Sequence, residues 1–363
     1  MVKRLATASM LGALCLALVG PAGASASPGH FAHTYFHVQP KVSTSPYGLS
    51  PAQIKNAYGF STSITAGSAK TIAIVDAYDD PTAEADLNVF SSQYGLPPCT
   101  TANGCFKKVN QTGGSSYPRT NAGWALEISL DIQWAHAIAP GAKILLVEAS
   151  TNSFANLLAA EDYAKTHAQY VSNSWGGGES SGESSNDSHF SQAGVSFFVS
   201  SGDNGTPAEY PSSSPNVVSV GGTTLNLDSN GNVTSETGWS GGGGGCSAYE
   251  AAPAAQSSFS QYAQVNCGGK RATPDLSLDA DPATGVSVYD STRYQGLAGW
   301  WKVGGTSASS PMAAGHAAVL GVTVTPAYIY GGTPNYRDVT SGNNGAPCLV
   351  GYDLCTGRGA WLN

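Results

Sequence analysis

Charged side chains are scarce in this chain of 363 residues, because Asp, Glu, Lys and Arg together make up only 11% of it, against roughly a quarter in ordinary soluble proteins. Basic residues are the rarer kind, with 16 Lys and Arg against 24 Asp and Glu and a formal net charge of −8. This balance argues against nucleic acid or an anionic membrane as a partner. With few cationic groups, positive self-repulsion stays small when carboxylates become protonated, which favours tolerance of acid.

Long apolar runs are also lacking. The apolar run at residues 11–19 is too short to favour a membrane anchor. It follows Lys3 and Arg4 and precedes a small-residue site at 24–26, which together are typical of a secretory signal peptide. We therefore expect residues 1–26 to be removed and the protein to be secreted. Without Lys3 and Arg4 the charges are 14 basic and 24 acidic, a net charge of −10.

Cysteine is rare, with seven in the chain, and one of them, Cys15, lies in the expected signal peptide. The other six predict three disulfides in an exported protein. No histidine stands at metal-like spacing from these cysteines, so a zinc site is not expected. The six fall into three couples of near neighbours, which we interpret as local bridges: Cys99–Cys105, Cys246–Cys267 and Cys348–Cys355.

Short apolar strands alternate with helical segments along most of the chain. Strands are expected at residues 71–75, 143–147, 170–174, 195–200 and 217–220, and helices at 124–138, 154–167, 189–193 and 312–320. This alternation predicts an α/β fold, a mostly parallel sheet with helices on both faces, whose chemistry gathers beyond the carboxyl ends of the strands. Residues 27–45 are expected to form a short polar extension, 46–363 one domain, and 238–245 a mobile or tightly turned glycine loop.

Residues 304–311, Gly-Gly-Thr-Ser-Ala-Ser-Ser-Pro, lead directly into the apolar helix expected at 312–320. Pro311 is expected within the first turn of that helix, where no amide partner is lost. This places Ser307 at or just before a helix N-terminus, where unpaired amides favour a developing negative charge. Such a position suits an acyl-transfer nucleophile, although a Ser/Thr-rich helix cap is the plain alternative.

A serine nucleophile needs a base, and the histidines are poor candidates. None of His136, His167 and His189 is followed by glycine, as in the His-Gly turn of subtilisins. A triad of Asp76, His136 and Ser307 therefore stays as the weaker alternative. A secreted, non-catalytic binding protein with Gly/Ser-rich ligand loops is the alternative from another functional class.

Carboxyl groups offer a different base. Glu127 and Asp131 are spaced i, i+4, which puts both on one face of the expected helix. Two close carboxylates share one proton and hold it more strongly than a single carboxylate would. A carboxylate base suits an enzyme that works at acidic pH, where histidine is protonated and cannot accept a proton. Asp203 follows the strand expected at 195–200, and a protonated Asp there could donate to an oxyanion. The plain alternatives are an exposed acidic pair and a Gly-Asp turn.

Glu127 with Asp131, Ser201-Gly202-Asp203 and residues 304–311, in this order, resemble the sedolisin (serine-carboxyl peptidase) family, including kumamolisin-like enzymes. The resemblance covers roughly residue 47 to the C-terminus. It implies a subtilisin-like fold and an acid-active endopeptidase that cleaves proteins or peptides through an acyl-enzyme. It also implies roles: Ser307 as nucleophile, Glu127 as general base and acid, Asp131 orienting Glu127, and Asp203 with the Ser307 amide holding the oxyanion.

The resemblance implies further sites. The strand of Ser174, Trp175 and Gly176 would align the substrate backbone by β-augmentation, and Asp76 would be structural. One structural Ca²⁺ would be held by oxygen ligands near the C-terminus, from Asp338, Val339, Leu349, Gly351 and Asp353. Two features depart from the family: Leu349 stands where relatives often have Gly, and residues 27–45 are too short for the usual long prodomain. We expect a monomer.

Overall fold

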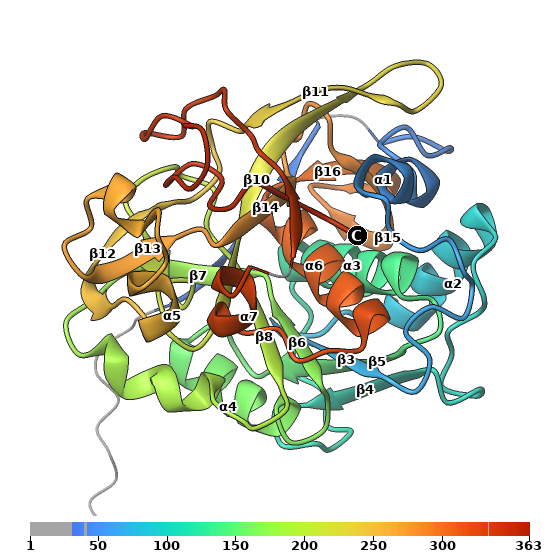
Figure 1. The fold of residues 1–363 in the computed structure, drawn as a ribbon. Helices are drawn as coiled ribbons and strands as arrows, with labels where there is room; N and C mark the ends of the chain where they lie inside the picture. Colours follow the sequence, from blue (N-terminus) through green and yellow to red (C-terminus); the bar gives the residue numbers. More distant parts are fainter. Residues whose placement is uncertain (1–30, 40–41, 333) are drawn as a thin grey trace, which may run out of the picture.

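The computed structural model describes residues 31–39, 42–332 and 334–363 (Figure 1). The signal peptide expected at residues 1–26 lies outside these ranges. None of the helices in the described ranges combines the length and apolarity that crossing a bilayer requires.

A ten-stranded sheet forms the centre of the protein. Its neighbours run parallel from β4 to β18, and only β17 and β11 pair antiparallel, at β18 and β10. The sheet is therefore mostly parallel, as the sequence predicts. The strands, in spatial order, are β4 (Phe106–Asn110), β5 (Lys143–Ala149), β3 (Thr71–Ala77), β6 (Tyr170–Asn173), β8 (Ser196–Ser200), β10 (Val218–Leu227), β14 (Leu276–Asp279), β18 (Ala360–Leu362) and β17 (Asn335–Arg337), with β11 (Val233–Gly238) beside β10.

Helices cover both faces of this sheet, which makes it doubly wound. On β3, Ile72 and Ile74 belong to one apolar core, while Ala73 and Val75 belong to the other, because alternate side chains of a strand point to opposite faces. The first core also contains α3 (Ala122–Ile138) and α6 (Thr306–Leu320), side by side in Figure 1, with α1 (Pro51–Tyr58) and α2 (Ala83–Tyr94); the second contains α4 (Phe154–Ala164).

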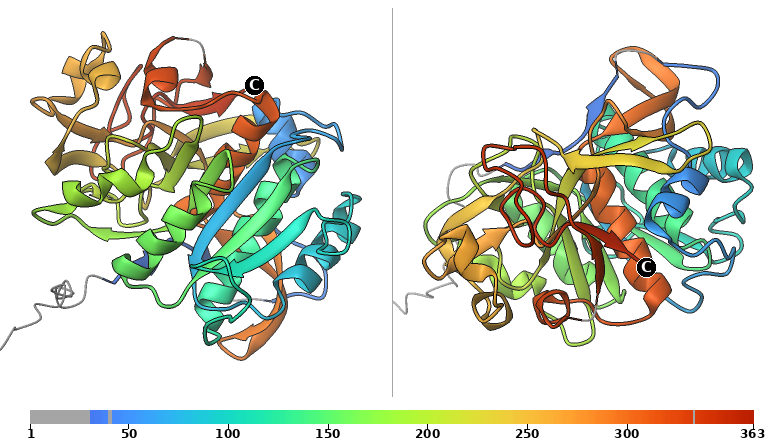
Figure 2. Two further views of the ribbon diagram at one scale, coloured as in Figure 1. Left: turned by 90° about the horizontal axis from the view of Figure 1, so that it is seen from below. Right: turned by 45° about the horizontal axis from the view of Figure 1, so that its top comes forward.

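Smaller sheets accompany the central sheet, and Figure 2 shows the ribbon from two further sides. The segment after residue 30 is not a loose extension, because it adds one strand to each of two of these sheets. The remaining elements are β1 (His33–Thr34) with β7 (Trp175–Gly178) and β9 (Glu209–Tyr210); β2 (His37–Val38) with β15 (Val286–Tyr294) and β16 (Leu297–Gly304); β12 (Gly245–Ala251) with β13 (Lys270–Thr273); η1 (Glu183–Phe190), α5 (Ala254–Ser257), η2 (Tyr262–Val265) and α7 (Pro326–Tyr330).

Several element predictions need correction. The helix expected at 154–167 ends at Ala164, because Thr166 and His167 bond back to the carbonyl of Tyr163 and form a turn. The helix expected at 189–193 is wrong, since a 3₁₀ helix ends at Phe190. The strand expected at 217–220 continues to Leu227, where its second half pairs with β11.

The glycine loop at 238–245 is tightly turned rather than mobile. Residues 242–245 are buried. The Gly243 amide donates a hydrogen bond of 2.7 Å to the Gly202 carbonyl, and the Gly205 amide donates one of 2.9 Å to the Gly241 carbonyl. The loop therefore holds the turn that carries Asp203.

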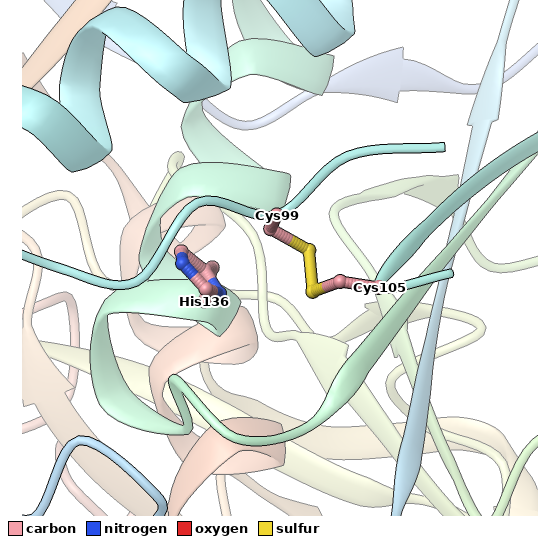
Figure 3. A group of neighbouring side chains, drawn as sticks. All are labelled: Cys99, Cys105 and His136. Atoms are coloured by element: carbon pink, nitrogen blue, oxygen red, sulfur yellow. A yellow bond between two sulfur atoms is a disulfide. The ribbon is translucent and has the colours of Figure 1, made fainter. Parts of the chain in front are cut away.

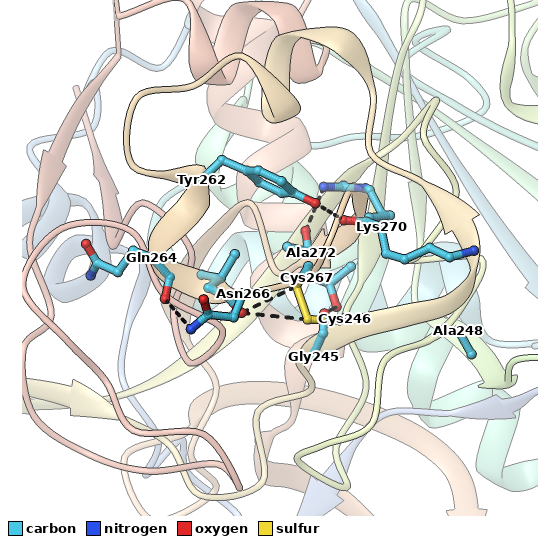
Figure 4. The surroundings of a disulfide bond; sticks show 12 residues. Gly245, Cys246, Ala248, Tyr262, Gln264, Asn266, Cys267, Lys270 and Ala272 are labelled. Atoms are coloured by element: carbon cyan, nitrogen blue, oxygen red, sulfur yellow. Dashed lines mark hydrogen bonds between the residues drawn. A yellow bond between two sulfur atoms is a disulfide. The ribbon is translucent and has the colours of Figure 1, made fainter.

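The three predicted disulfides are confirmed: Cys99–Cys105, Cys246–Cys267 and Cys348–Cys355 are all bonded. Each closes a short loop, with sequence separations of 6, 21 and 7 residues. The second ties the start of β12 to the turn before β13 (Figure 4).

Candidate active site

Ser307 lies in the first turn of α6 and is fully buried. The helix is preceded by Gly305, whose φ of +109° suits only glycine. The helix begins earlier than expected, at Thr306, so Pro311 lies in its second turn and not in its first. Because proline has no N–H, the Ser307 carbonyl loses its helical partner, and Ser174 Oγ lies 3.4 Å from that carbonyl. A hydroxyl from outside the helix thus lies near the freed carbonyl.

Glu127 and Asp131 lie on α3, which begins after an Asn121 side chain that accepts from the Gly123 and Trp124 amides. Both carboxyls are fully buried. They are therefore not the exposed acidic pair of the plain alternative. The Asp131 Oδ1 accepts a hydrogen bond of 2.9 Å from Ser174 Oγ, so this hydroxyl lies between Asp131 and the α6 turn.

The close packing of α3 against α6 brings these carboxyls to Ser307. A Cβ on Gly315 of α6 would lie only 2.9 Å from the Cβ of Ile138 on α3. Only a glycine allows this approach. The small residues of α6, which the sequence shows as an apolar helix, thus set the distance between the two helices.

Burial raises the pKa of Glu127 well above its ordinary value, and the charges of Asp131 and Asp76 raise it further. The nearby Ser307 hydroxyl acts in the opposite direction and lowers this pKa. The two side chains nevertheless form no hydrogen bond of normal geometry, since neither Glu127 oxygen has a partner among the described residues. Ser307 Oγ instead lies 3.5 Å from the Ser174 carbonyl.

A third carboxyl completes this cluster. Asp76 lies near the end of β3, fully buried, and burial followed by the charges of Asp131 and Glu148 raises its pKa. Burial also raises the pKa of Asp131, while the Ser174 hydroxyl lowers it. Burial raises the pKa of all three carboxyls, and neighbouring carboxylates raise the pKa of Glu127 and Asp76 further, so the cluster holds protons at pH values where isolated carboxyls are ionised.

Asp203 lies on the turn after β8, buried against the start of α6. Its Oδ1 accepts from the Thr306 amide and from Thr306 Oγ1, both at 2.8 Å. Its Oδ2 lies 3.2 Å from Nε2 of His37. Burial raises the pKa of Asp203, and the hydrogen bond with His37 lowers it. Hydrogen bonds to Oδ1 thus fix the carboxyl, and Oδ2 lies beside Gly305.

His136 does not belong to the site. It lies nine positions after Glu127 on α3, about 13 Å along the axis at 1.5 Å per residue. Its Nε2 is 2.9 Å from the Pro97 carbonyl, and burial lowers its pKa to about 4. Cys99 and Cys105 lie beside it (Figure 3), but as a disulfide they offer no thiolate to a metal. The structure does not assemble the alternative triad of Asp76, His136 and Ser307.

The strand expected to align substrate pairs along one edge with an extended segment of the chain. Trp175 itself is buried, and its Nε1 donates a hydrogen bond of 2.9 Å to the carbonyl of Val75. Its backbone, with that of Gly176, pairs antiparallel with Thr34 and His33 of β1. Ser174 differs, because its side chain bonds Asp131. The segment therefore combines a paired backbone edge with a support for the carboxyl cluster.

The residues expected to hold calcium gather in one loop near the C-terminus. Asp338 Oδ2 accepts from the Gly351 amide at 2.9 Å, and Asp353 Oδ2 from the Leu349 amide at 2.7 Å. Val339 is 1% exposed. Among the described residues, the carbonyls of Val339, Leu349 and Gly351 accept no hydrogen bond. Two carboxylates and three available carbonyls fit a hard cation such as Ca²⁺.

Sequence reasoning missed four residues at the site: Thr306, Glu209, Tyr35 and His37. Thr306 adjoins Ser307 and could have been suspected from that motif. Glu209 accepts from the Tyr35 hydroxyl, and His37 meets Asp203. Residues 27–45 show no periodic pattern, so nothing local signals these contacts.

This arrangement is typical of a serine peptidase on an α/β fold, in which a serine at a helix N-terminus lies beside buried carboxyls. Comparison with known proteins gives the same class, because residues 119–326 match the model of the subtilase family. The chain is 29% identical to kumamolisin of Bacillus sp. (strain MN-32), over 88% of this chain and 63% of that protein. It is 35% identical to sedolisin of Pseudomonas sp. (strain 101), over 46% of this chain and 32% of that protein. It is 30% identical to xanthomonalisin of Xanthomonas sp. (strain T-22), over 76% of this chain and 41% of that protein.

Among solved structures, Pseudomonas sedolisin, a serine-carboxyl proteinase complexed with two molecules of pseudo-iodotyrostatin, is similar with a TM-score of 0.74 and 28% identity, over 87% of this chain and 96% of that one. Sphericase shares the fold, with a TM-score of 0.57 and 18% identity, over 88% of this chain and 98% of that one. The chain belongs to the subtilase family and, within it, to the sedolisin (serine-carboxyl peptidase) group. It spans 63%, 32% and 41% of the curated relatives above.

Proposed function

We infer that this chain is a secreted, acid-active serine-carboxyl endopeptidase that hydrolyses peptide bonds in protein substrates. The observation that carries this proposal is the position of Ser307, in the first turn of α6, beside the buried carboxyls of Glu127 and Asp131. Membership of the sedolisin group supports it.

In the proposed mechanism, Ser307 Oγ attacks the substrate carbonyl and Glu127 takes its proton. Asp131 shares that proton and is itself oriented by Ser174. Glu127 then returns the proton to the leaving amine, and water hydrolyses the acyl-enzyme by the same route in reverse. The Ser307 amide and a protonated Asp203 would hold the oxyanion.

The raised pKa values support activity in acid. Burial is the main cause that raises the pKa values of Glu127, Asp131 and Asp76, and neighbouring charge is the next, so the cluster tends to keep a proton. Burial likewise favours the protonated form of Asp203, the form that can donate to an oxyanion. Rising pH removes these protons, so the donor at Asp203 and the shared proton of the base are both lost.

Calcium belongs to the proposal as a structural ion. Asp338 and Asp353 would supply carboxylate oxygens, and Val339, Leu349 and Gly351 carbonyl oxygens. When bound, the ion would neutralise the two carboxylates and tie the C-terminal loop. Leu349 can serve through its carbonyl in place of the glycine common in the family.

We also propose a domain organisation and a class of partner for this chain. Residues 1–26 would be the signal peptide and 46–363 a monomeric peptidase domain, with proteins or peptides as substrates. Nucleic acid and membranes are not expected partners, because basic residues are outnumbered 16 to 24.

Digestion of casein across pH tests the proposal. The wild type is expected to digest casein in acid, and Ser307→Ala to lose at least about a thousandfold in rate, since a triad acts as a unit. Ser309→Ala is the matched control, because Ser309 is buried in the same helical turn and bonds only the Thr306 carbonyl. Full activity in Ser307→Ala, or loss in both variants alike, would contradict the assignment of the nucleophile.

A further inference from the structure

A turn between β14 and β15, residues 279–284, contacts the glycines that precede Ser307. Its Ala280 carbonyl accepts a hydrogen bond of 2.5 Å from the Gly305 amide, two positions before Ser307. A Cβ on Gly304 would lie 2.5 Å from the same carbonyl oxygen, so this contact requires the glycine at position 304. The 279–284 turn is therefore packed directly against the start of α6.

Two consecutive amides before Ser307 are held by different parts of the chain. The Gly305 amide bonds Ala280, and the Thr306 amide donates a hydrogen bond of 2.8 Å to Asp203. Because the directions of these two amides are fixed, the direction of the next one, the Ser307 amide, is restricted as well. That amide is one of the two groups proposed to hold the oxyanion, and its direction matters for the reaction.

Strand β10 fixes Ala280 in its turn. The amides of Ala280 and Asp281 donate hydrogen bonds of 2.9 and 3.1 Å to the same carbonyl oxygen, that of Thr223. The Asp281 carboxylate in addition accepts a hydrogen bond of 2.7 Å from Thr224 Oγ1. The 279–284 turn thus joins the central sheet to the residues that carry the nucleophile.

The side chain of Asp279 closes this turn. Its Oδ1 accepts a hydrogen bond of 2.8 Å from Thr284 Oγ1 and one of 3.2 Å from the Leu225 amide. The Asp279 amide donates a hydrogen bond of 2.8 Å to the Tyr58 hydroxyl on α1. One carboxyl oxygen therefore joins the first and last residues of the turn and ties both to β10.

The other carboxyl oxygen of Asp279 is free. Asp279 is fully buried, and its Oδ2 has no hydrogen-bond partner among the described residues. Burial raises the pKa of Asp279 well above its ordinary value, although the hydrogen bonds from Thr284 and Leu225 lower it. A protonated carboxyl without a partner for its second oxygen is less costly to bury than an ionised one, and a neutral amide has almost the same shape.

We propose that Asp279 is a positioning residue for the peptidase reaction, because it shapes the turn whose Ala280 carbonyl orients Gly305 and, through it, Ser307. This inference rests on the proposed function. Asp279 touches none of the reacting groups and acts only through the turn.

The effect of Asp279 should fall on the chemical step and not on substrate binding. Strand β7, which is expected to align substrate, pairs with β1 and β9, whereas the 279–284 turn connects β14 with β15. A displaced turn would therefore leave the aligning strand in place while it misdirects the Ser307 amide. A group that acts only in the transition state lowers kcat and kcat/KM equally when it is lost.

Steady-state digestion of casein at pH 4 tests this role in the full chain. Asp279→Ala is expected to lower kcat at least about tenfold with KM nearly unchanged, since a small displacement of reacting groups costs a large factor in rate. Asp279→Asn keeps the Oδ1 acceptor and a neutral side chain, and is expected to restore near-normal kcat. A raised KM with normal kcat in Asp279→Ala, or an Asp279→Asn protein as slow as Asp279→Ala, would overturn the inference.

Asp290→Ala is the matched control. Asp290 lies on β15, is equally buried and likewise has one oxygen without a partner among the described residues, while its other oxygen accepts from the Thr292 amide at 2.8 Å. Its kcat is expected to stay near the wild-type value. Equal losses in Asp279→Ala and Asp290→Ala would show that removal of any buried carboxyl slows the enzyme, and would overturn the inference.

Thr284→Val tests the closure of the turn even if Asp279→Ala does not fold. Valine has nearly the shape of threonine but lacks the hydroxyl that bonds Asp279 Oδ1. Thr284→Val is expected to lower kcat by roughly fivefold, the factor that one hydrogen bond typically represents, with KM unchanged. Melting temperatures at pH 4 establish which variants are folded. A folded Thr284→Val protein with wild-type kcat would overturn the role given to the turn.

The wild type separates this inference from the proposed function. If the wild type digests casein and Asp279→Ala matches it, the inference fails and the proposed function stands. A wild type that digests no casein overturns the proposed function, and this inference with it.

Discussion

Burial of single carboxyl side chains sets their pKa values and so decides which of them can accept or donate a proton. Glu127 is fully buried, so its charged form lacks water, and the carboxyls of Asp131 and Asp76 favour its protonated form further. Glutamine has almost the same shape and hydrogen-bonding atoms but cannot accept the serine proton. Glu127→Gln is therefore expected to keep the fold and lose general base catalysis, a factor of roughly 10²–10⁴.

The positions of the main side chains could be predicted where the information is local. The spacing of Glu127 and Asp131 fixes them on one helix face, and the structure brings Glu127 to the Ser307 hydroxyl while Asp131 contacts Ser174. Their catalytic roles stay predictions. The contact of His37 with Asp203 depends on how a patternless segment crosses the molecule, so the sequence offers no signal for it.

The helices and strands were predictable where apolar patterns are long. The helix expected at 124–138 and the strand at 71–75 differ from α3 and β3 by no more than two residues at either end. Errors occur where other contacts decide the boundary. Pro311 stands in the second turn of α6, where Ser174 Oγ, from a distant part of the chain, lies 3.4 Å from the freed carbonyl. Such a contact cannot be inferred from the helix sequence itself.

The C-terminal loop leads to a prediction about calcium. The carboxylates of Asp338 and Asp353 accept hydrogen bonds only from amides and one hydroxyl of the same loop, so an ion that joins them should stabilise the folded state. Binding at 100 times Kd adds about 2.7 kcal/mol. We therefore expect EGTA to lower the melting temperature of Ser307→Ala, which cannot digest itself, by several degrees, and added Ca²⁺ to restore it.

Asp353→Asn should remove this response. Asp228→Asn is its control, because Asp228 lies in an exposed turn and bonds only its own neighbours. A melting temperature that is the same in EGTA and in Ca²⁺ would show that the loop is stable without the ion.

The protein as a whole carries many buried carboxyls whose pKa values are raised, mainly by burial. The pKa rises to about 6 in Asp80 and to about 8 in Glu148, Glu161 and Asp290. For each group the native state holds its proton more strongly than the unfolded chain, whose carboxyls titrate near pH 4. Their stabilisation is complete below about pH 4 and is lost as pH rises through the native values.

Two buried histidines act in the opposite direction. Burial lowers the pKa of His136 and His316 to about 4, so their stabilisation is lost as pH falls from about 6.5 toward 4. The carboxyls with raised pKa values outnumber these two histidines. The melting temperature of Ser307→Ala, measured by calorimetry, is therefore expected to fall by several degrees between pH 5 and pH 8. A melting temperature that rises over this interval would contradict the protonated state assigned to the buried carboxyls.

The dependence of kcat/KM on pH in Glu127→Gln tests most directly whether a buried carboxyl activates the serine. Glu161→Gln is the matched control, because Glu161 is equally buried but lies on α4, outside the site. We expect wild-type activity to be confined to acid, Glu127→Gln to lose a factor of roughly 10²–10⁴ in kcat/KM at every pH, and Glu161→Gln to keep near-normal rates. A Glu127→Gln protein that keeps wild-type activity, with a plateau above pH 7, would show that another group removes the proton from Ser307.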